Sequence, residues 1–223
     1  MISMPAVLDH VFICTAIGAP AAENLRRLGL VEGSRNHHPG QGTACRRFFF
    51  HNAMLELLWV ANVEEAGSEQ TRATRLLERW SESGHEASPF GIVLRPDSPS
   101  GNGCPFPSFE YRPETMPGFS IRIADGTGIE EPMWCYMDGG RPYGEAPPER
   151  RQPVDHSAGF REITGVRLTC PGLPKTSVTH AMARENAITL GTGPEHLLQL
   201  EFDGGQRGGR ADFRPDLPLI FSF

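Results

Sequence analysis

The strand-like run MLELLWV at residues 54–60 holds one carboxylate, Glu56, among apolar side chains. Because side chains alternate between the two faces of a strand, Glu56 is predicted to share a face with Met54 and Leu58. An ionised carboxylate that leaves water needs a cation, a metal ion or several hydrogen-bond donors, since its uncompensated burial is costly. We therefore expect the partner of Glu56 to identify the functional site.

A second polar side chain within an apolar run is His10, which lies in AVLDHVFICT at residues 6–15. It is the polar exception on its predicted strand face. Imidazole nitrogen and carboxylate oxygen together suit zinc, nickel, manganese or non-haem iron. His10 and Glu56 are therefore candidate ligands of one divalent metal ion. The alternative is a buried pair, His10 with Glu56 or Arg46 with Glu56, that holds no metal.

Two other histidines are candidates for a third metal ligand. His38 lies in NHHPGQG at residues 36–42, where the Pro and Gly content predicts a loop whose glycines let the backbone approach a ligand closely. His156 lies at the end of a Pro- and Gly-rich stretch, residues 138–157, which is long enough to be a lid, a linker or an arm. A third protein ligand would leave open positions on the metal for a substrate.

Arg46 and Arg47 begin a strand that continues with three phenylalanines. One of the two arginines has to share the face of Phe48 and Phe50, where a guanidinium would bind a substrate carboxylate or neutralise the acid of the next strand. Trp134 is expected in the core or in the wall of a cavity, as large aromatic side chains in strands usually are.

The elements that would position these groups follow from the hydrophobic pattern. Residues 45–50 and 54–60 are predicted to form a hairpin around a short turn. Residues 20–28 predict an amphipathic helix, opened by a proline and closed by a glycine, and residues 31–35 a brief strand. The first 60 residues thus predict the order β-α-β-β-β.

The remainder of the chain predicts a helix at 68–83 and a less regular group of strands at 88–137. Residues 158–223 resemble the first unit in pattern, with Gly165 and Gln199 in the places of the histidine and the glutamate. We expect one compact structural domain with four segments: a first βαβββ module at 1–62, a connecting helix and second group of strands at 63–137, a loop at 138–157 and a C-terminal module-like unit at 158–223.

Composition restricts the partners. The net charge of −6, with no basic run, argues against nucleic acid or an anionic membrane surface, so a small-molecule substrate or ligand is expected. Five cysteines without a CxxC motif indicate neither a disulfide framework nor a zinc ribbon, which fits a cytoplasmic protein. No stretch reaches the roughly 18 apolar residues of a membrane span. Exposed sheet edges leave a homodimer open.

The sequence resembles the vicinal oxygen chelate superfamily, and within it the glyoxalase-like or glyoxalase/bleomycin-resistance type of domain. The resemblance rests on His10 in LDHV, Glu56 in LELLWV and the predicted β-α-β-β-β order. HPGQGT at residues 38–43 is similar to a loop of glyoxalase-like members, and DHSAGFREITGV, with His156, is similar to the segment that leads into their C-terminal strand.

This resemblance implies an α+β fold in which βαβββ modules form a half-open barrel. It implies that the first and last strands of a module supply metal ligands, here His10 and Glu56, with His38 as the third. The implied reaction is a lyase, isomerase or dioxygenase step on a substrate with neighbouring oxygens, with Glu56 as a catalytic group. The expected substrate contacts are Arg46, Arg47, Phe48, Phe50, Trp134 and His156.

The sequence departs from the family pattern at one point. A complete site of the glyoxalase type takes four ligands from two modules, whereas neither Gly91 in PFGIVLRP nor Gly165 in ITGVRL offers one. The alternative function is therefore a metal-free binding protein of the drug-sequestering type, which keeps the fold and holds a ligand without catalysis.

Overall fold

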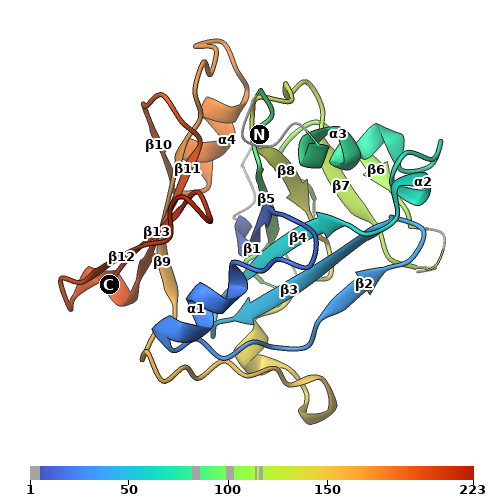
Figure 1. Ribbon diagram of the computed structural model, residues 1–223. Coiled ribbons are helices and arrows are strands. Elements are labelled where there is room, and N and C mark those ends of the chain that lie inside the picture. The colour runs from blue at the N-terminus through green and yellow to red at the C-terminus, as the bar shows by residue number, and fades with distance from the viewer. Residues whose placement is uncertain (1–5, 82–85, 99–102, 114, 116–117) are drawn as a thin grey trace.

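The computed structural model describes residues 6–81, 86–98, 103–113, 115 and 118–223, and its strands form two sheets (Figure 1). The eight-stranded sheet contains β1 (Ala6–Cys14), β2 (Asn36–His38), β3 (Thr43–Phe49), β4 (Met54–Val60), β5 (Phe90–Pro96), β6 (Ser108–Tyr111), β7 (Ile121–Ala124) and β8 (Met133–Tyr136). The five-stranded sheet contains β9 (Ile163–Thr169), β10 (Ile188–Gly191), β11 (Leu197–Phe202), β12 (Arg210–Asp212) and β13 (Leu219–Ser222). The helices within the described residues are α1 (Ala22–Leu28), α2 (Val63–Ala66), α3 (Leu76–Ser81) and α4 (Thr179–Glu185).

The larger sheet consists of two four-stranded halves that meet along β1 and β5. Its strand order is β2-β3-β4-β1-β5-β8-β7-β6. Within each half the first strand runs parallel to the last, β1 beside β4 and β5 beside β8, whereas β1 and β5 are antiparallel. The sheet curls into a half-barrel, so the predicted α+β class with a half-open barrel is confirmed.

The second half of the barrel comes from residues 90–136 and not from the C-terminal segment. In that segment β11 runs antiparallel to β9, whereas β4 runs parallel to β1 in the first half. Residues 163–222 therefore build a separate sheet with the order β10-β9-β11-β13-β12, which stands beside the larger one in Figure 1. The C-terminal segment does not repeat the module, and Gly165 and Gln199 do not occupy the places of His10 and Glu56. The predicted division of the chain into four segments otherwise stays a prediction.

One face of the first half packs into the hydrophobic core, and the other lines a cavity. Leu55 and Leu57 of β4 and Phe48 of β3 are fully buried in a core that also contains Phe202 and Phe221 of the smaller sheet. Met54, Glu56 and Leu58 point to the opposite face and line a cavity. The predicted alternation along β4 is thus confirmed, and the smaller sheet covers the face that carries no cavity.

Helix α1 covers the same core face. Its buried residues are Ala22 and Leu25, which join the main core cluster. It ends at Gly29, which adopts a φ of 104° that glycine reaches at little cost. The N–H group of Gly29 donates to the carbonyl oxygens of Arg26 and Leu25. The helix predicted for residues 20–28 is therefore confirmed to within two residues.

Three local predictions differ from the structure. The short strand falls at Asn36–His38 rather than at residues 31–35, because it pairs with the start of β3. The helix predicted for 68–83 is interrupted: residues 72–74 form a 3-10 turn and α3 begins only at Leu76, since Arg75 adopts a left-handed φ of 56°. Its predicted last two residues lie outside the described part of the chain. Helix α2 lies before the predicted range and was not predicted. Strands β10 and β12 were not predicted.

No described helix combines the length and the apolar character that crossing a membrane requires.

Candidate metal and ligand site

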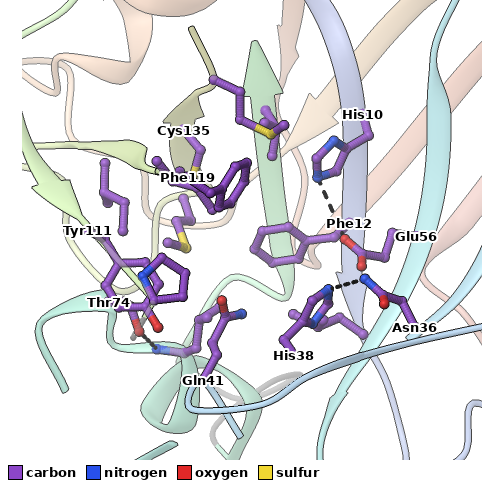
Figure 2. A pocket seen from close by; sticks show the side chains of 18 of the residues that line it. His10, Phe12, Asn36, His38, Gln41, Glu56, Thr74, Tyr111, Phe119 and Cys135 are labelled. Atoms are coloured by element: carbon purple, nitrogen blue, oxygen red, sulfur yellow. Dashed lines mark hydrogen bonds and ion pairs between the residues drawn. The ribbon is translucent and has the colours of Figure 1, made fainter. Parts of the chain in front are cut away.

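The concave face of the half-barrel encloses a cavity of about 210 Å³. Figure 2 shows its polar side, with His10, Asn36, His38 and Glu56, opposite a wall that includes Tyr111, Phe119 and Cys135. The polar side belongs to β1, β2 and β4 of the first half, and most of the opposite wall belongs to the second half. The two halves thus contribute different chemistry to one cavity.

His10 and Glu56, distant in sequence, meet in this cavity because β1 lies beside β4. The parallel register pairs His10 with Met54 and Phe12 with Glu56. The Nε2 atom of His10 lies 3.6 Å from Oε2 of Glu56, and both side chains are nearly buried. The structure therefore brings together the two residues from which a metal site was predicted.

Asp9 holds the other ring nitrogen of His10. Its Oδ1 accepts a hydrogen bond of 2.7 Å from Nδ1 of His10, although neighbouring residues in a regular strand point to opposite faces. A bulge makes this contact possible, because the β1–β5 register shifts between Leu8 and His10. Asp9 itself is only 2% exposed. The ring of His10 is therefore fixed from behind by a buried carboxylate.

This arrangement requires a positive charge between Nε2 of His10 and the carboxylate of Glu56. A carboxylate can only accept hydrogen bonds, so Nδ1 of His10 must carry the proton shared with Asp9. If Nε2 were unprotonated, its lone pair would face the Glu56 carboxylate directly. Burial alone would lower the pKa of His10, but the hydrogen bond and charge of Asp9, with the charge of Glu56, raise it above its ordinary value. The pair is thus arranged to hold a proton or a metal ion.

His38 lies on β2 at the rim of the same polar side. Its Nδ1 is 2.9 Å from the hydroxyl of Thr43, and its Nε2 is 2.9 Å from the amide nitrogen of Asn36. Because that amide donates, Nε2 accepts and Nδ1 donates to Thr43. Burial lowers the pKa of His38, which favours a neutral ring. A neutral imidazole with a defined lone pair is the form that binds metals.

Cys45 completes a group of potential ligands that sequence reasoning did not identify. Its thiol, a nitrogen of His38 and an oxygen of Glu56 all lie within 4.8 Å of one another. In the β3–β4 register Cys45 pairs with Leu58 and Arg47 pairs with Glu56, so both side chains of β3 face the cavity side. The alternation along β3 was available from the sequence, but Cys45 was not considered there as a ligand.

The two arginines of β3 point in opposite directions. Arg46 is 4% exposed on the core face, where its guanidinium pairs with Glu32 and Glu23, so it lies away from Glu56 and outside the cavity. Arg47 lines the cavity, donates to the carbonyl and hydroxyl oxygens of Ser34, and lies over the ring of Phe49. The postulated Arg46–Glu56 pair is therefore wrong, and Arg47 is the arginine within reach of a ligand.

The second half contributes an apolar wall. Its cavity-lining side chains are Val93, Tyr111, Pro113, Phe119, Ile121, Ile123, Met133, Cys135 and Met137. A Cβ on Gly91 would lie 1.9 Å from the ring of Phe12, so that ring occupies the space beside β5. The hydroxyl of Tyr111 is buried and has no hydrogen-bond partner among the described residues. Among the described residues, this wall offers one unpaired hydroxyl and no imidazole or carboxylate.

Tyr143, from the loop between the sheets, is a cavity residue that the sequence did not indicate. Its hydroxyl donates a 2.8 Å hydrogen bond to Oδ1 of Asp9, and its ring packs edge-on against Phe49. Burial, followed by the charge of Asp9, raises its pKa, so the hydroxyl keeps its proton. The loop predicted to be a lid or linker thus supplies part of the support behind His10.

Besides Arg46, four predicted ligand contacts lie outside the cavity. Phe48, Phe50 and Trp134 are fully buried in the main core. His156 is 8% exposed and serves as a structural bridge, accepting a hydrogen bond from the Val31 N–H and donating one to the Phe49 carbonyl. Both its ring nitrogens are thereby used, and it does not line the cavity. His156 is therefore not placed to be the third metal ligand.

Comparison with known proteins gives a consistent picture of the fold. Residues 8–100 match the sequence profile of a family described as a glyoxalase-like domain. A hypothetical protein from Staphylococcus aureus aligns over 97% of this chain and 98% of its own, with 12% identity and a TM-score of 0.54. No curated protein matches the chain.

Two weaker structural similarities involve proteins with named activities. A mutant of 4-hydroxymandelate synthase from Streptomyces coelicolor aligns over 81% of this chain and 50% of its own, with 12% identity and a TM-score of 0.37. A xylose isomerase-like TIM barrel/4-hydroxyphenylpyruvate dioxygenase fusion protein aligns over 88% and 36%, with 12% identity and a TM-score of 0.41. At these scores neither similarity assigns an activity to this chain.

Proposed function

Because this chain carries a glyoxalase-like domain of the vicinal oxygen chelate type, we propose that it binds one divalent metal ion and a small molecule with neighbouring oxygens. The metal ligands in this proposal are His10, Glu56 and His38. The reaction class is a lyase, isomerase or dioxygenase step, and the metal, when bound, would supply a Lewis acid for the substrate oxygens.

One observation carries the proposal: the 3.6 Å separation between Nε2 of His10 and Oε2 of Glu56. Nitrogen and oxygen ligands at metal bonds of roughly 2.1 Å lie about 3.0–3.4 Å apart. The observed pair is therefore close to the spacing of two ligands on one ion. Asp9 adds the carboxylate behind a ligating histidine that often accompanies such sites, since it fixes the ring and strengthens the ligand.

The chain's own residues would orient a substrate in defined ways. Arg47, held by Ser34, presents a cation beside the polar side of the cavity and would bind an anionic group of the substrate. The Tyr111 hydroxyl on the opposite wall is buried and has no hydrogen-bond partner among the described residues, so a substrate oxygen that reached it would satisfy it. Glu56 lines the cavity and would accept a proton from a bound molecule, which is the catalytic role proposed for it.

The test is metal analysis of protein purified without chelators, with titration of zinc, nickel, manganese and iron(II). We expect near one equivalent in the wild type and its loss in Glu56→Gln, which keeps the shape of the side chain and removes its charge. Glu64→Gln, on an exposed glutamate, is the matched control and should retain the metal. A wild-type protein that binds none of the four metals would refute metal-dependent function.

The second candidate function is metal-free binding of a small ligand, as in drug-sequestering proteins. It is favoured by the apolar far wall, where the described part of the chain provides no histidine or carboxylate ligand. A thermal-shift screen with dicarbonyls, catechols and hydrophobic antibiotics separates the two functions when it is run with and without metal. A ligand present at a hundred times its dissociation constant adds about 2.7 kcal/mol of stability. Stabilisation that is independent of metal and unchanged in Glu56→Gln would support the binding protein.

A further inference from the structure

We propose that Cys45 is a ligand of the same metal ion, so that the centre contains a thiolate and selects thiophilic metals. This inference rests on the proposed metal site and specifies its donor set. With His10, His38 and Glu56, a thiolate would make a four-donor centre of two nitrogens, one oxygen and one sulfur. Such a set suits zinc, cobalt or iron better than magnesium, calcium or manganese, which prefer oxygen ligands.

The first argument is the position of the thiol. Cys45 is fully buried on the cavity side of β3, and its sulfur lies within 4.8 Å of ligand atoms of both His38 and Glu56. These three residues come from β2, β3 and β4, which are adjacent strands. Sheet pairing therefore fixes the positions of the three donors relative to one another, whereas residues that cluster by chance on a surface are not held in this way.

The second argument is the spacing. Around a tetrahedral ion with metal–sulfur bonds of about 2.3 Å and metal–nitrogen bonds of about 2.0–2.1 Å, donor atoms lie about 3.4–3.6 Å apart. The 4.8 Å limit on the separations among Cys45, His38 and Glu56 thus requires these donor atoms to approach one another by at most about 1.4 Å. His10 stands 3.6 Å from Glu56 but lies outside this group of three residues, so it has to move closer to His38 or Cys45 to share the ion.

The third argument is that His38 is prepared for this role. The Thr43 hydroxyl accepts a hydrogen bond from Nδ1–H of His38, so the lone pair is on Nε2 and faces the Asn36 amide. The Asn36 amide has only to turn aside for Nε2 to bind a metal. Thr43 also accepts a hydrogen bond from Gln41, so the group behind His38 is itself held in place.

An alternative role for Cys45 as a nucleophile is disfavoured by its surroundings. Burial, followed by the negative charge of Glu56, raises the pKa of the thiol far above its ordinary value. A free thiolate therefore does not form near neutral pH, whereas a coordinated thiol loses its proton to the metal.

The test uses cobalt(II), because a cobalt–thiolate bond gives an intense sulfur-to-metal charge-transfer band in the near ultraviolet, which nitrogen and oxygen ligands do not. We expect this band in the wild type and its loss in Cys45→Ser, together with at least a roughly tenfold loss of zinc affinity. Cys135→Ser is the matched control, since Cys135 is also buried and lines the cavity from the opposite wall. It should keep both the band and the affinity.

The outcomes separate this inference from the function on which it rests. A wild-type cobalt complex without the band, whose metal is nevertheless lost in Glu56→Gln, overturns the role of Cys45 and leaves the metal site standing. Loss of the band in Cys135→Ser instead of Cys45→Ser also overturns it. Absence of any metal binding overturns both. If Cys45→Ser does not fold, the wild-type spectrum and the Cys135→Ser control still decide the question.

Discussion

Replacing Asp9 by Asn tests whether the buried carboxylate behind His10 supports metal binding. Asp9 accepts hydrogen bonds from Nδ1 of His10 and from the hydroxyl of Tyr143, both on Oδ1, while its Oδ2 lies 3.7 Å from the guanidinium of Arg95. An asparagine has one oxygen and one donating nitrogen. If its oxygen stays toward His10, its NH₂ group faces Arg95; if it turns, the NH₂ group faces the Nδ1 proton. Either orientation places two donors together.

The expected size of the effect follows from this loss. Changes to the group behind a ligating histidine typically weaken metal affinity 10–100-fold, which corresponds to about 1.4–2.8 kcal/mol of binding free energy. The charged hydrogen bond lost by His10 is worth about 1.5–3 kcal/mol, which is the same range. We therefore expect zinc to bind Asp9→Asn between one and two orders of magnitude more weakly than it binds the wild type.

The assay is competition for zinc against a chromophoric chelator at fixed pH, with thermal denaturation to verify that the variant is folded. Tyr143→Phe is the control, because it removes the second hydrogen bond to Asp9 and leaves the bond to His10 in place. Its affinity should fall less than that of Asp9→Asn. A folded Asp9→Asn protein with wild-type zinc affinity would refute the supporting role of Asp9.

Three further predictions concern stability and ligand binding. Gly91→Ala should lower the free energy of unfolding by about 1–3 kcal/mol, because its Cβ meets the ring of Phe12, and Phe12→Ala should relieve part of that loss in the double variant, as chemical denaturation would measure. Burial lowers the pKa of His156 below 6.5, so its neutral ring stabilises the fold above about pH 6.5, and this stability is lost as the pH falls. In urea unfolding between pH 5 and 7, the free energy of unfolding should therefore depend less on pH in His156→Gln than in the wild type. Equal slopes in the two proteins would contradict this explanation. Arg46→Met should cost about 1.5–3 kcal/mol because the mostly buried Glu32 then keeps only its ion pair with the exposed Arg35, whereas Arg47→Met should change the melting temperature little and weaken the binding of anionic ligands.

The first half of the barrel could be predicted because its polar exceptions stand out against regular strands. Alternation along β4 correctly gave Glu56 the face of Met54 and Leu58. His10 was recognisable for the same reason, as a polar side chain in an apolar strand. Their contact needed the parallel pairing of β1 with β4, which the family resemblance implied and the spacing alone did not.

The second half could not be recognised in the same way, because it has no comparable signal. Gly91 and Cys135 look like ordinary residues of buried strands, and no described helix separates β5 from β6 as α1 separates β1 from β2. The C-terminal segment was more conspicuous, since its strand–helix–strand order imitates the first unit. The strand order β10-β9-β11-β13-β12 and the antiparallel pairing of β9 with β11 distinguish it from a module.

The site itself was predicted in part for equally physical reasons. Strict alternation assigns Asp9 and His10 to opposite faces, and a bulge, which leaves no clear mark in this sequence, overrides it. The directions of Arg46 and Arg47 depended on register, which hydrophobic residues on both faces of β3 leave undefined. Tyr143 belongs to a loop whose path over the barrel no local pattern encodes.

The unequal walls of the cavity have a consequence for any molecule that enters it. A barrel built from two equivalent halves could bind a molecule in either of two orientations, which are related by the rotation that exchanges the halves. Here one half presents imidazoles and a carboxylate, and the other presents methionine, isoleucine and aromatic rings. A molecule with an oxygen-bearing head and a hydrocarbon tail therefore fits in one sense only, with its oxygens toward His10, His38 and Glu56 and its tail toward the opposite wall.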